Sequence, residues 1–293
     1  MSRILCIGVA TQDVLLRVAH YPAEDAEVRA LARSRRPGGN AANSAQVLAQ
    51  FRHEVELLAA LARDDDGDWL GQTLAVAGVG FRYCPRLPGA TPTSFITLAA
   101  DRATRTIVHH RELPEIARQA LDGVPLEVFD WFHCEGRNVT ETRAMLEHIR
   151  SIRIDQGISL ELEKPRADIE TLLPLADVLL YSRDYAVAQG HTDPTHFLAA
   201  QQASYPHAAL QTVAWGAAGA YGIEPDGTLH HQPAAPAGPA IDTLGAGDTY
   251  NAGVIHALVS GRTPREAIAY GVRLAGCKVA QAGFANLARQ APL

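Results

Sequence analysis

Hydrophobic and polar positions follow two different periods along the chain, and their succession predicts an α/β fold. Short apolar runs, typical of strands buried on both faces of a sheet, occur at residues 4–8, 131–134, 158–162, 178–181 and 209–214. Beyond residue 130, segments with helical spacing fall between these runs, at residues 140–152, 166–173, 184–189 and 195–203. This alternation is typical of a doubly wound, mainly parallel sheet with helices on both faces.

Two inserts interrupt the pattern with the period-2 alternation of hairpins. Residues 13–18 and 27–33 form one predicted strand pair, and residues 93–100 and 105–111 form the second. We expect these inserts, residues 12–36 and 92–112, to pair into a small antiparallel β lid over the ligand crevice. No linker or internal repeat divides the rest of the sequence, so residues 1–293 are interpreted as one domain that carries a lid.

The stretch DTLGAGDTYNAGVIHALVS, residues 242–260, carries the most specific chemical pattern. Gly245, Ala246 and Gly247 form a small-residue loop that opens an apolar-periodic helix. Unpaired N–H groups and the positive end of the helix dipole make such a loop an anion site, most often for phosphate. Asp248 follows at once, where a carboxylate would repel a phosphate that was merely bound.

Two interpretations of Asp248 follow from this position. A carboxylate beside an anion site makes chemical sense if it takes a proton from a hydroxyl while the N–H groups hold a phosphoryl group in transit. The structural alternative is that Asp248 caps the helix and the glycines turn the chain.

A second glycine turn, Gly38-Gly39-Asn40, opens a helix predicted over residues 40–51. Asn40 and Asn43 lie in its first turn, where short amides either cap the helix or reach a polyhydroxyl ligand. Capping alone explains Asn40 well, whereas Asn43 lies past the cap position.

Composition excludes several classes of protein. A chain that is 47% apolar and 20% charged can bury a sizeable core, and a net charge of −6 gives no support for a nucleic-acid partner. The first ten residues are too short and too polar beyond Ala10 for a signal peptide or membrane span, so we expect a cytoplasmic protein without a membrane partner. The four cysteines lie far apart, as reduced core residues do, and the paired histidines lack zinc-ligand spacing.

With these motifs in view, the chain resembles the ribokinase-like carbohydrate kinases, the PfkB family, from end to end. DTLGAGD matches the C-terminal motif of that family and PGGNAANS, residues 37–44, its N-terminal one. YPAED, HCEGRN, ELEKPR, AWGAAGA and QAGF resemble the ketohexokinase subfamily in order and spacing. The resemblance implies an ATP-dependent, Mg²⁺-dependent kinase that phosphorylates a ketose, most specifically fructose to fructose 1-phosphate.

The resemblance also implies roles for individual residues. Asp248 would be the general base, and the N–H groups of residues 244–247 would stabilise the developing charge. Arg105 matches a lid arginine near the transferring phosphate; by itself it reads as a solvated hairpin charge. The implied sugar contacts are Asp13, Asp25, Gly39, Asn40 and Asn43, and the implied nucleotide loop is Gly216, Ala217, Ala218 and Gly219, together with Gly245 and Gly247.

Asp25 matches a residue that reaches the sugar site of a neighbouring subunit, which implies a homodimer through the lid; its alternative is a turn aspartate. Asp242 and the segment after Gln281 match the position of a potassium ion, although Asp242 also fits a structural turn. The Asn-x-x-Glu motif that organises magnesium in many relatives is replaced by Ser182-Arg183-Asp184-Tyr185. We therefore assign no protein ligand to Mg²⁺.

Three functions remain open at this point: a fructose-type ketose kinase, a kinase of the same fold for another ketose, a sugar acid or a nucleoside, and a sugar-sensing protein without turnover. The intact Asp248 and glycine loop argue against the third. The lid is rich in Asp and Arg rather than aromatic residues, which suits a polyol better than a nucleoside.

Overall fold

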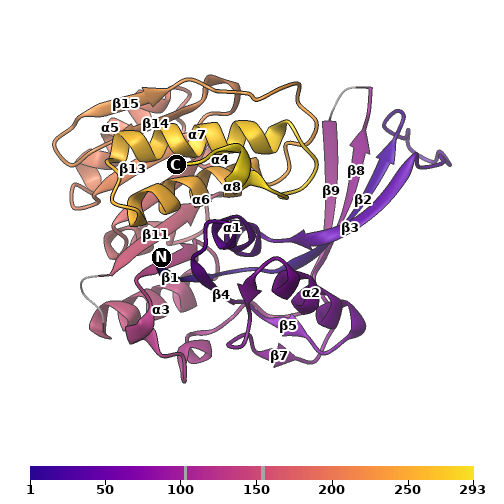
Figure 1. Ribbon diagram of the computed structural model, residues 1–293, viewed down its shortest axis with the longest axis horizontal. Coiled ribbons are helices and arrows are strands. Elements are labelled where there is room, and N and C mark those ends of the chain that lie inside the picture. The colour runs from indigo at the N-terminus through magenta and orange to yellow at the C-terminus, as the bar shows by residue number, and fades with distance from the viewer. Residues whose placement is uncertain (102–103, 153–155) are drawn as a thin grey trace.

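The computed structural model describes residues 1–101, 104–152 and 156–293, and its main feature is a large sheet with helices on both faces (Figure 1). Within these residues nine strands pair in the order β15-β14-β13-β12-β11-β10-β1-β4-β6. The neighbouring strands β13, β12, β11, β10, β1, β4 and β6 are parallel to one another. The strands β14 and β15 add an antiparallel edge. Their bounds are β1 (Arg3–Ile7), β4 (Glu54–Leu58), β6 (Val79–Gly80), β10 (Trp131–Glu135), β11 (Gly157–Leu162), β12 (Val178–Ser182), β13 (Leu210–Ala214), β14 (Ala220–Ile223) and β15 (Leu229–Gln232).

Alternation along each central strand divides the core between the two faces of the sheet. In β1, Ile4 and Cys6 face one layer of helices while Leu5 and Ile7 face the other, and all four are buried. The first layer contains α1 (Asn40–Ala49), α2 (Asp65–Val76), α6 (Ala246–Val259), α7 (Pro264–Val279) and α8 (Leu287–Gln290). The second contains α3 (Val139–Ile152), α4 (Arg183–Ala188) and α5 (Pro194–Ser204).

The lid is a separate sheet of order β3-β2-β8-β9 that extends away from the helical layers (Figure 1). Its strands are β2 (Thr11–Val18), β3 (Ala32–Gly38), β8 (Thr93–Ala99) and β9 (Thr104–His110). Each insert forms an antiparallel hairpin, as predicted, and a parallel β2–β8 pair joins the two. Residues 102–103, between the two predicted strands of the second insert, lie outside the described residues.

The strand predicted at residues 27–33 is wrong in its position. Val28 and Leu31, which suggested the alternation, are exposed in the connection between β2 and β3. The strand instead covers Ala32–Gly38, where a polar sequence is held by backbone pairing with β2, from Arg17–Ala32 to Thr11–Gly38. Edge pairing therefore decided the register, and side-chain pattern did not.

Helix starts follow the local chemistry closely. The Asp64 carboxylate accepts from the Gly67 N–H and caps α2, so the acidic run there is structural. Thr263 and Glu266 form a capping box at the start of α7, with Pro264 in its first turn. The helix predicted at residues 166–173 is instead a 3₁₀ segment, η3 (Ile169–Leu175), which contains Pro174.

The remaining elements are short: β5 (Leu61–Ala62) and β7 (Arg86–Leu87) form a small pair, and η1 (Arg118–Leu121), η2 (Leu126–Val128) and η4 (Gly216–Ala218) are 3₁₀ turns. The carboxyl ends of the parallel strands all open at one edge of the sheet, the edge at which open α/β sheets bind ligands.

Candidate active site

Asp248 lies in the first turn of α6, buried with 6% of its surface exposed. Gly245, with φ of 78°, is the cap residue, and α6 begins at Ala246. Asp248 is therefore not the N-cap, which removes the capping interpretation of this residue. Its Oδ2 atom accepts a hydrogen bond of 2.7 Å from Nδ2 of Asn43 on α1. The structure thus joins the two glycine-turn helices at this carboxylate.

The turn that opens α6, residues 244–247, is called the anion loop below. The Leu244 N–H donates to Oδ1 of Asp242 at 3.0 Å, and the Ala246 N–H donates to the Thr243 carbonyl at 3.3 Å. The expectation that all N–H groups of residues 244–247 serve an anion is therefore wrong for Leu244 and for Ala246. In the part of the chain that the structure describes, the N–H groups of Gly245 and Gly247 have no protein acceptor.

The start of α1 presents Asn40 and Asn43 to the edge of the sheet at which the parallel strands end. Gly39 is the cap residue, with φ of 92°, and no side chain caps this helix. Asn40 does not cap; its Nδ2 donates to Oε1 of Glu161 at 3.1 Å and to Oε2 of Glu163 at 3.3 Å. The capping interpretation of Asn40 is thus wrong, because the chain enters α1 through a glycine conformation that brings the amide to the end of β11.

Buried carboxylates at the ends of two strands lie near Asp248. Glu135 ends β10 and Glu161 lies in β11, and both are buried. Oε1 of Glu135 accepts from the N–H groups of Val9 at 3.0 Å and Ala41 at 2.6 Å, so this side chain anchors the start of α1 to β1. Glu161 keeps its Oε2 atom without a partner among the described residues.

Burial and mutual repulsion raise the pKa of these groups. The pKa of Asp248 rises to about 7, chiefly because of burial, with Glu135, Glu163 and Asp13 adding repulsion and the Asn43 hydrogen bond acting against it. Burial and the charges of Asp248, Glu135 and Glu163 raise the pKa of Glu161 well above its ordinary value. A carboxylate poised near neutrality in a crevice is the arrangement expected of a general base.

Asp13 and Gly39 lie on the lid side of this group. Asp13 on β2 is buried with 6% exposed, and its Oδ1 accepts from the Thr11 hydroxyl at 3.0 Å. Burial raises the pKa of Asp13, against hydrogen bonds from Thr11 and Ser94 and the charge of Arg36. The predicted contacts Asp13, Asn40 and Asn43, with Gly39 next to Asn40, thus lie near the carboxylates of Asp248 and Glu161.

Two lid arginines reach the segment that leads into the anion loop. Nη1 of Arg105, on β9, donates to the Thr243 hydroxyl at 2.8 Å. Nη1 of Arg36, on β3, donates to Oδ2 of Asp242 at 2.8 Å. Arg105 is therefore more than a solvated hairpin charge, and Arg36 is a contact that sequence reasoning did not identify.

The predicted nucleotide loop lies further along the same sheet edge. Gly216, Ala217 and Ala218 form η4 directly after β13, and the Trp215 N–H donates to the Gly219 carbonyl at 2.7 Å. β13 is separated from β11 by β12 alone, so this turn flanks the carboxylate group. Asp25 lies apart: it is exposed, with φ of 60°, in the connection between β2 and β3 at the far end of the lid (Figure 1).

Two further residues of the site carry weak signals in sequence. Glu135 and Glu161 belong to HCEGRN and ELEKPR, and their position at predicted strand ends was the available clue. Lys278, which contacts Asp242, lies inside a long amphipathic helix, and nothing in its spacing marks it.

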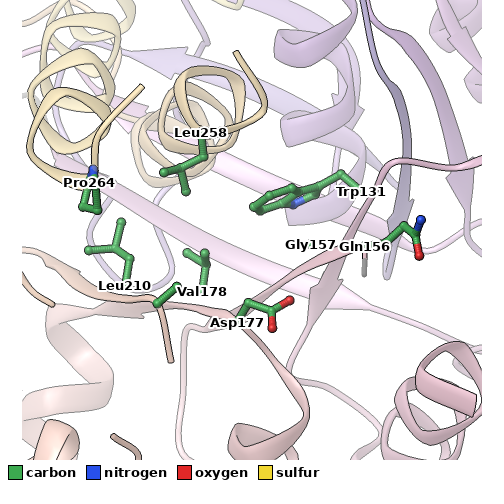
Figure 2. A pocket seen from close by; sticks show the side chains of 9 residues that line it. Trp131, Gln156, Gly157, Asp177, Val178, Leu210, Leu258 and Pro264 are labelled. Carbon is green, nitrogen blue, oxygen red and sulfur yellow. The ribbon is translucent and has the colours of Figure 1, made fainter. Parts of the chain in front are cut away.

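A hollow of about 320 Å³ lies at the opposite edge of the sheet (Figure 2). It begins at the amino ends of the strands, with Trp131, Gly157, Val178 and Leu210, and Leu258 and Pro264 close it from the helical side. Its carboxylate, Asp177, already accepts from the Ile158 N–H at 2.8 Å and pairs with Arg150 at 2.7 Å. Parallel sheets bind ligands at the other edge, so we place the chemistry there.

Within the described residues, no cluster of three or more His, Cys, Asp or Glu side chains has the arrangement of a metal site. Within them, too, no helix has the length and apolar character needed to cross a membrane.

Comparison with known proteins identifies the family to which the chain belongs. The model of the pfkB family of carbohydrate kinases matches residues 1–291. The chain is 33% identical to mouse ketohexokinase over 291 residues, which covers 97% of this chain and 98% of the mouse protein.

Solved structures agree on the fold. A putative ribokinase from Agrobacterium tumefaciens superimposes with a TM-score of 0.86 at 23% identity, covering 98% of this chain and 94% of that one. Arabidopsis thaliana ribokinase complexed with ribose and ATP superimposes with a TM-score of 0.79 at 18% identity, covering 97% of this chain and 94% of that one. The chain therefore belongs to the pfkB family of carbohydrate kinases, phosphotransferases that act on an alcohol group.

Proposed function

We propose that this kinase transfers the γ-phosphoryl group of ATP to a hydroxyl of a ketose, and specifically converts fructose to fructose 1-phosphate. The observation that carries the proposal is the buried Asp248 carboxylate, which is hydrogen-bonded to Asn43. Beside it lie the N–H groups of Gly245 and Gly247, which have no acceptor among the described residues. A proton acceptor and an anion hole in adjacent positions are what phosphoryl transfer to an alcohol requires.

In the proposed reaction, Asp248 takes the proton of the acceptor hydroxyl while the oxygen of that hydroxyl bonds to the γ-phosphorus. The bond from that phosphorus to the bridging oxygen breaks, and ADP leaves with the electron pair. The N–H groups of Gly245 and Gly247 face the charge that develops on the phosphoryl group. Each such donor stabilises the transition state by about 3 kcal/mol. Arg105 approaches the same phosphoryl group from the lid, since it already contacts Thr243.

The acceptor is held by polar groups on both sides of the crevice. Asp13, Asn40 and Asn43 provide carboxylate and amide groups for several hydroxyls, and Oδ1 of Asn43 has no partner among the described residues. Gly39 has no side chain, so the backbone there can approach the sugar closely. Gly216, Ala217, Ala218 and Gly219 would pass over the nucleotide.

Mg²⁺ fits this site as an ion bound mainly by ATP and water. Mg²⁺ keeps several waters and commonly binds through substrate phosphates, and such an ion would neutralise phosphate charge. Glu161 and Glu163 would accept hydrogen bonds from its waters, because one Glu161 oxygen is unpartnered and buried at the site.

Fructose is the preferred acceptor because the likeness to mouse ketohexokinase extends over 97% of the chain. A second candidate is a kinase for another ketose, a sugar acid or a nucleoside, which would use the same Asp248 chemistry. A sugar sensor without turnover would not need the intact base and anion hole.

The deciding experiment is ADP release from Mg²⁺-ATP with fructose, tagatose, psicose, ribose, 2-keto-3-deoxygluconate and adenosine. Fast turnover on fructose, with NMR placing phosphate on C1, supports the proposal. Turnover on another acceptor alone would retain the mechanism and replace the substrate. Binding of a sugar by calorimetry without any turnover would favour the sensor.

We also propose a homodimer in which the lids of two copies face each other. On the outer face of the lid, the apolar residues Val14, Leu16, Phe95 and Val108 lie beside Arg33 and Arg35 of β3; Phe95 is 51% exposed and Val108 is 64% exposed. Strand register places these residues opposite the face that carries Asp13 and Arg105. A second lid packed there would bury them and bring the connection that holds Asp25 toward the neighbouring crevice.

A further inference from the structure

Lys278 is a fully buried cation beside the segment that leads into the anion loop. Its side chain, on α7, is 0% exposed. The ammonium Nζ donates to the carbonyl oxygen of Asp242 at 2.9 Å and lies 3.2 Å from Oδ2 of the same residue. A buried ammonium is stable only where it is paired and hydrogen-bonded, so these contacts fix it in place.

Asp242 is the residue at which the family resemblance implies a potassium ion, and its surroundings do not fit one. Its Oδ1 accepts from the Leu244 N–H, and its Oδ2 accepts from Arg36 and from the Gly283 N–H at 3.2 Å. Hydrogen-bond donors therefore occupy the oxygens that would coordinate the ion. The charges of Arg36 and Lys278 would also repel a further cation.

Asp242 remains ionised in this arrangement. Burial acts to raise its pKa, but the hydrogen bond and charge of Arg36 and the charge of Lys278 bring the pKa down to about 2. Asp242 is thus ionised across the neutral range. Burial lowers the pKa of Lys278, and the charge and hydrogen bond of Asp242 act against that lowering. Through Oδ1, Asp242 holds the Leu244 N–H and so the first residue of the anion loop.

The use of lysine here is specific to the position. The chain has 26 Lys and Arg residues, of which Lys164 and Lys278 are the lysines. An ammonium is a compact point charge, whereas a guanidinium is planar and larger. Most cationic side chains of this chain are arginines, but the buried position 278 has the more compact ammonium of lysine. The centroid of the Phe284 ring lies 5.5 Å from Nζ and bounds the space on another side.

We propose that Lys278 is a built-in substitute for a monovalent metal ion, holding Asp242 and the anion loop in the geometry of phosphoryl transfer, so that turnover is independent of K⁺. Lys278 acts through Asp242 and is a positioning residue. The inference rests on the proposed function for its effect on turnover, but cation binding can be measured without turnover.

The first test uses the unmodified protein. Turnover on the best acceptor of the panel and the melting temperature are measured in tetramethylammonium, sodium and potassium chloride at one ionic strength. We expect the three salts to give the same values. Activation by K⁺ of about five-fold or more, the lower end of a typical coupling between two sites, would overturn the proposal. So would a melting temperature raised by K⁺ alone, whatever the sugar panel shows.

The second test removes the ammonium. In Lys278→Ala we expect kcat in tetramethylammonium chloride to fall by about 5- to 150-fold, and K⁺, NH₄⁺ or ethylammonium to restore much of it by entering the vacated space. The same cations should raise the melting temperature of the variant and leave that of the parent protein unchanged.

Arg265→Ala, which removes an exposed positive charge from the same helix, is the matched control and should show neither effect. A folded Lys278→Ala protein that no cation rescues, or one that retains full kcat in tetramethylammonium, contradicts the proposal. If this variant does not fold, the salt comparison on the unmodified protein still decides the question.

Discussion

At the scale of single residues, Asp248 combines burial, a raised pKa and one strong hydrogen bond. The Asn43 amide fixes the carboxylate in position, while burial among other carboxylates makes it a better proton acceptor than an ordinary aspartate. These properties serve proton abstraction, because a base is most effective when its pKa lies near the working pH.

Asp248→Asn should lower kcat by about 10²–10⁴-fold, the usual contribution of a positioned base, while sugar and ATP still bind. The amide has the same shape and cannot accept the proton. ADP release and calorimetry measure the two properties. Asp65→Asn, at an exposed aspartate in α2, controls for loss of a carboxylate. Near-normal turnover in Asp248→Asn would exclude this residue as the base.

The pH profile should show the same group. Because the pKa of Asp248 is raised to about 7, the base is protonated and inactive below that pH. We expect kcat/KM to rise tenfold per pH unit up to an apparent pKa near 7 and then to level off. Initial rates at subsaturating sugar, from pH 5 to 9, provide the profile. A profile that stays flat between pH 5 and 7 would contradict this assignment.

At the scale of elements, the start of α1 shows how a backbone conformation positions side chains. Gly39 adopts φ of 92°, and a Cβ at this position would overlap the carbonyl oxygen of Val9. The close approach of α1 to the end of β1 is what carries Asn40 to Glu161 and Asn43 to Asp248.

Gly39→Ala should therefore destabilise the protein by more than the left-handed conformation alone costs. Gly190 has a similar φ, 86°, with open space around the added Cβ, so Gly190→Ala is the matched control. We expect about 1 kcal/mol for Gly190→Ala and about 2 kcal/mol or more for Gly39→Ala, measured by urea denaturation. Equal losses in the two variants would show that the Val9 contact is relieved at no cost.

At the scale of the whole molecule, the proposed dimer depends on the outer face of the lid. Phe95→Glu places a charge on this face and should convert a dimer to a monomer in light scattering, because burying a carboxylate in the interface costs free energy. Val187→Glu, at an exposed apolar residue of α4 away from the lid, should leave the mass unchanged. Asp25→Ala should keep the dimer and raise KM for the sugar. A wild-type protein that is monomeric at assay concentration would refute the dimer.

Stability at acid pH is a second property of the whole molecule. Burial lowers the pKa of His133 and of His256 to about 4, below the ordinary value of 6.5. The unfolded state then binds more protons between pH 6.5 and 4, so each histidine removes stability as pH falls through this window. Over the whole window, the loss at the fully buried His133 is about 3 kcal/mol. The raised pKa values of Asp248 and Glu161 act in the opposite direction.

A comparison with His133→Gln separates the pH-dependent loss of stability at His133 from the opposite effect of the carboxylates. The variant cannot take up the proton at this position, so its free energy of unfolding should fall less than that of the wild type between pH 7 and pH 4.5. Urea denaturation at several pH values measures both curves. Parallel curves would show that the pKa of His133 is not lowered in the folded protein.

Sequence by itself determined the features that depend on residues close together in the chain, namely the secondary structure and the local motifs. Period-2 and period-3.6 patterns predicted the parallel sheet, its helices and the two lid hairpins, and the glycine turns located the starts of α1 and α6. The motifs around Asp248 and Asn43 were enough to suggest the family. All of these features are encoded within short segments, where local sterics and hydrogen bonding decide the conformation.

The tertiary structure decided which polar groups meet. It paired Asn40 with Glu161, used the Leu244 N–H for Asp242, and placed the ammonium of Lys278 against the same residue. It also set the register of β3, whose polar sequence has no face of its own. Such contacts depend on how crossover connections stack distant segments, and a buried polar group takes the partner that packing brings within reach rather than one specified by its neighbours in sequence.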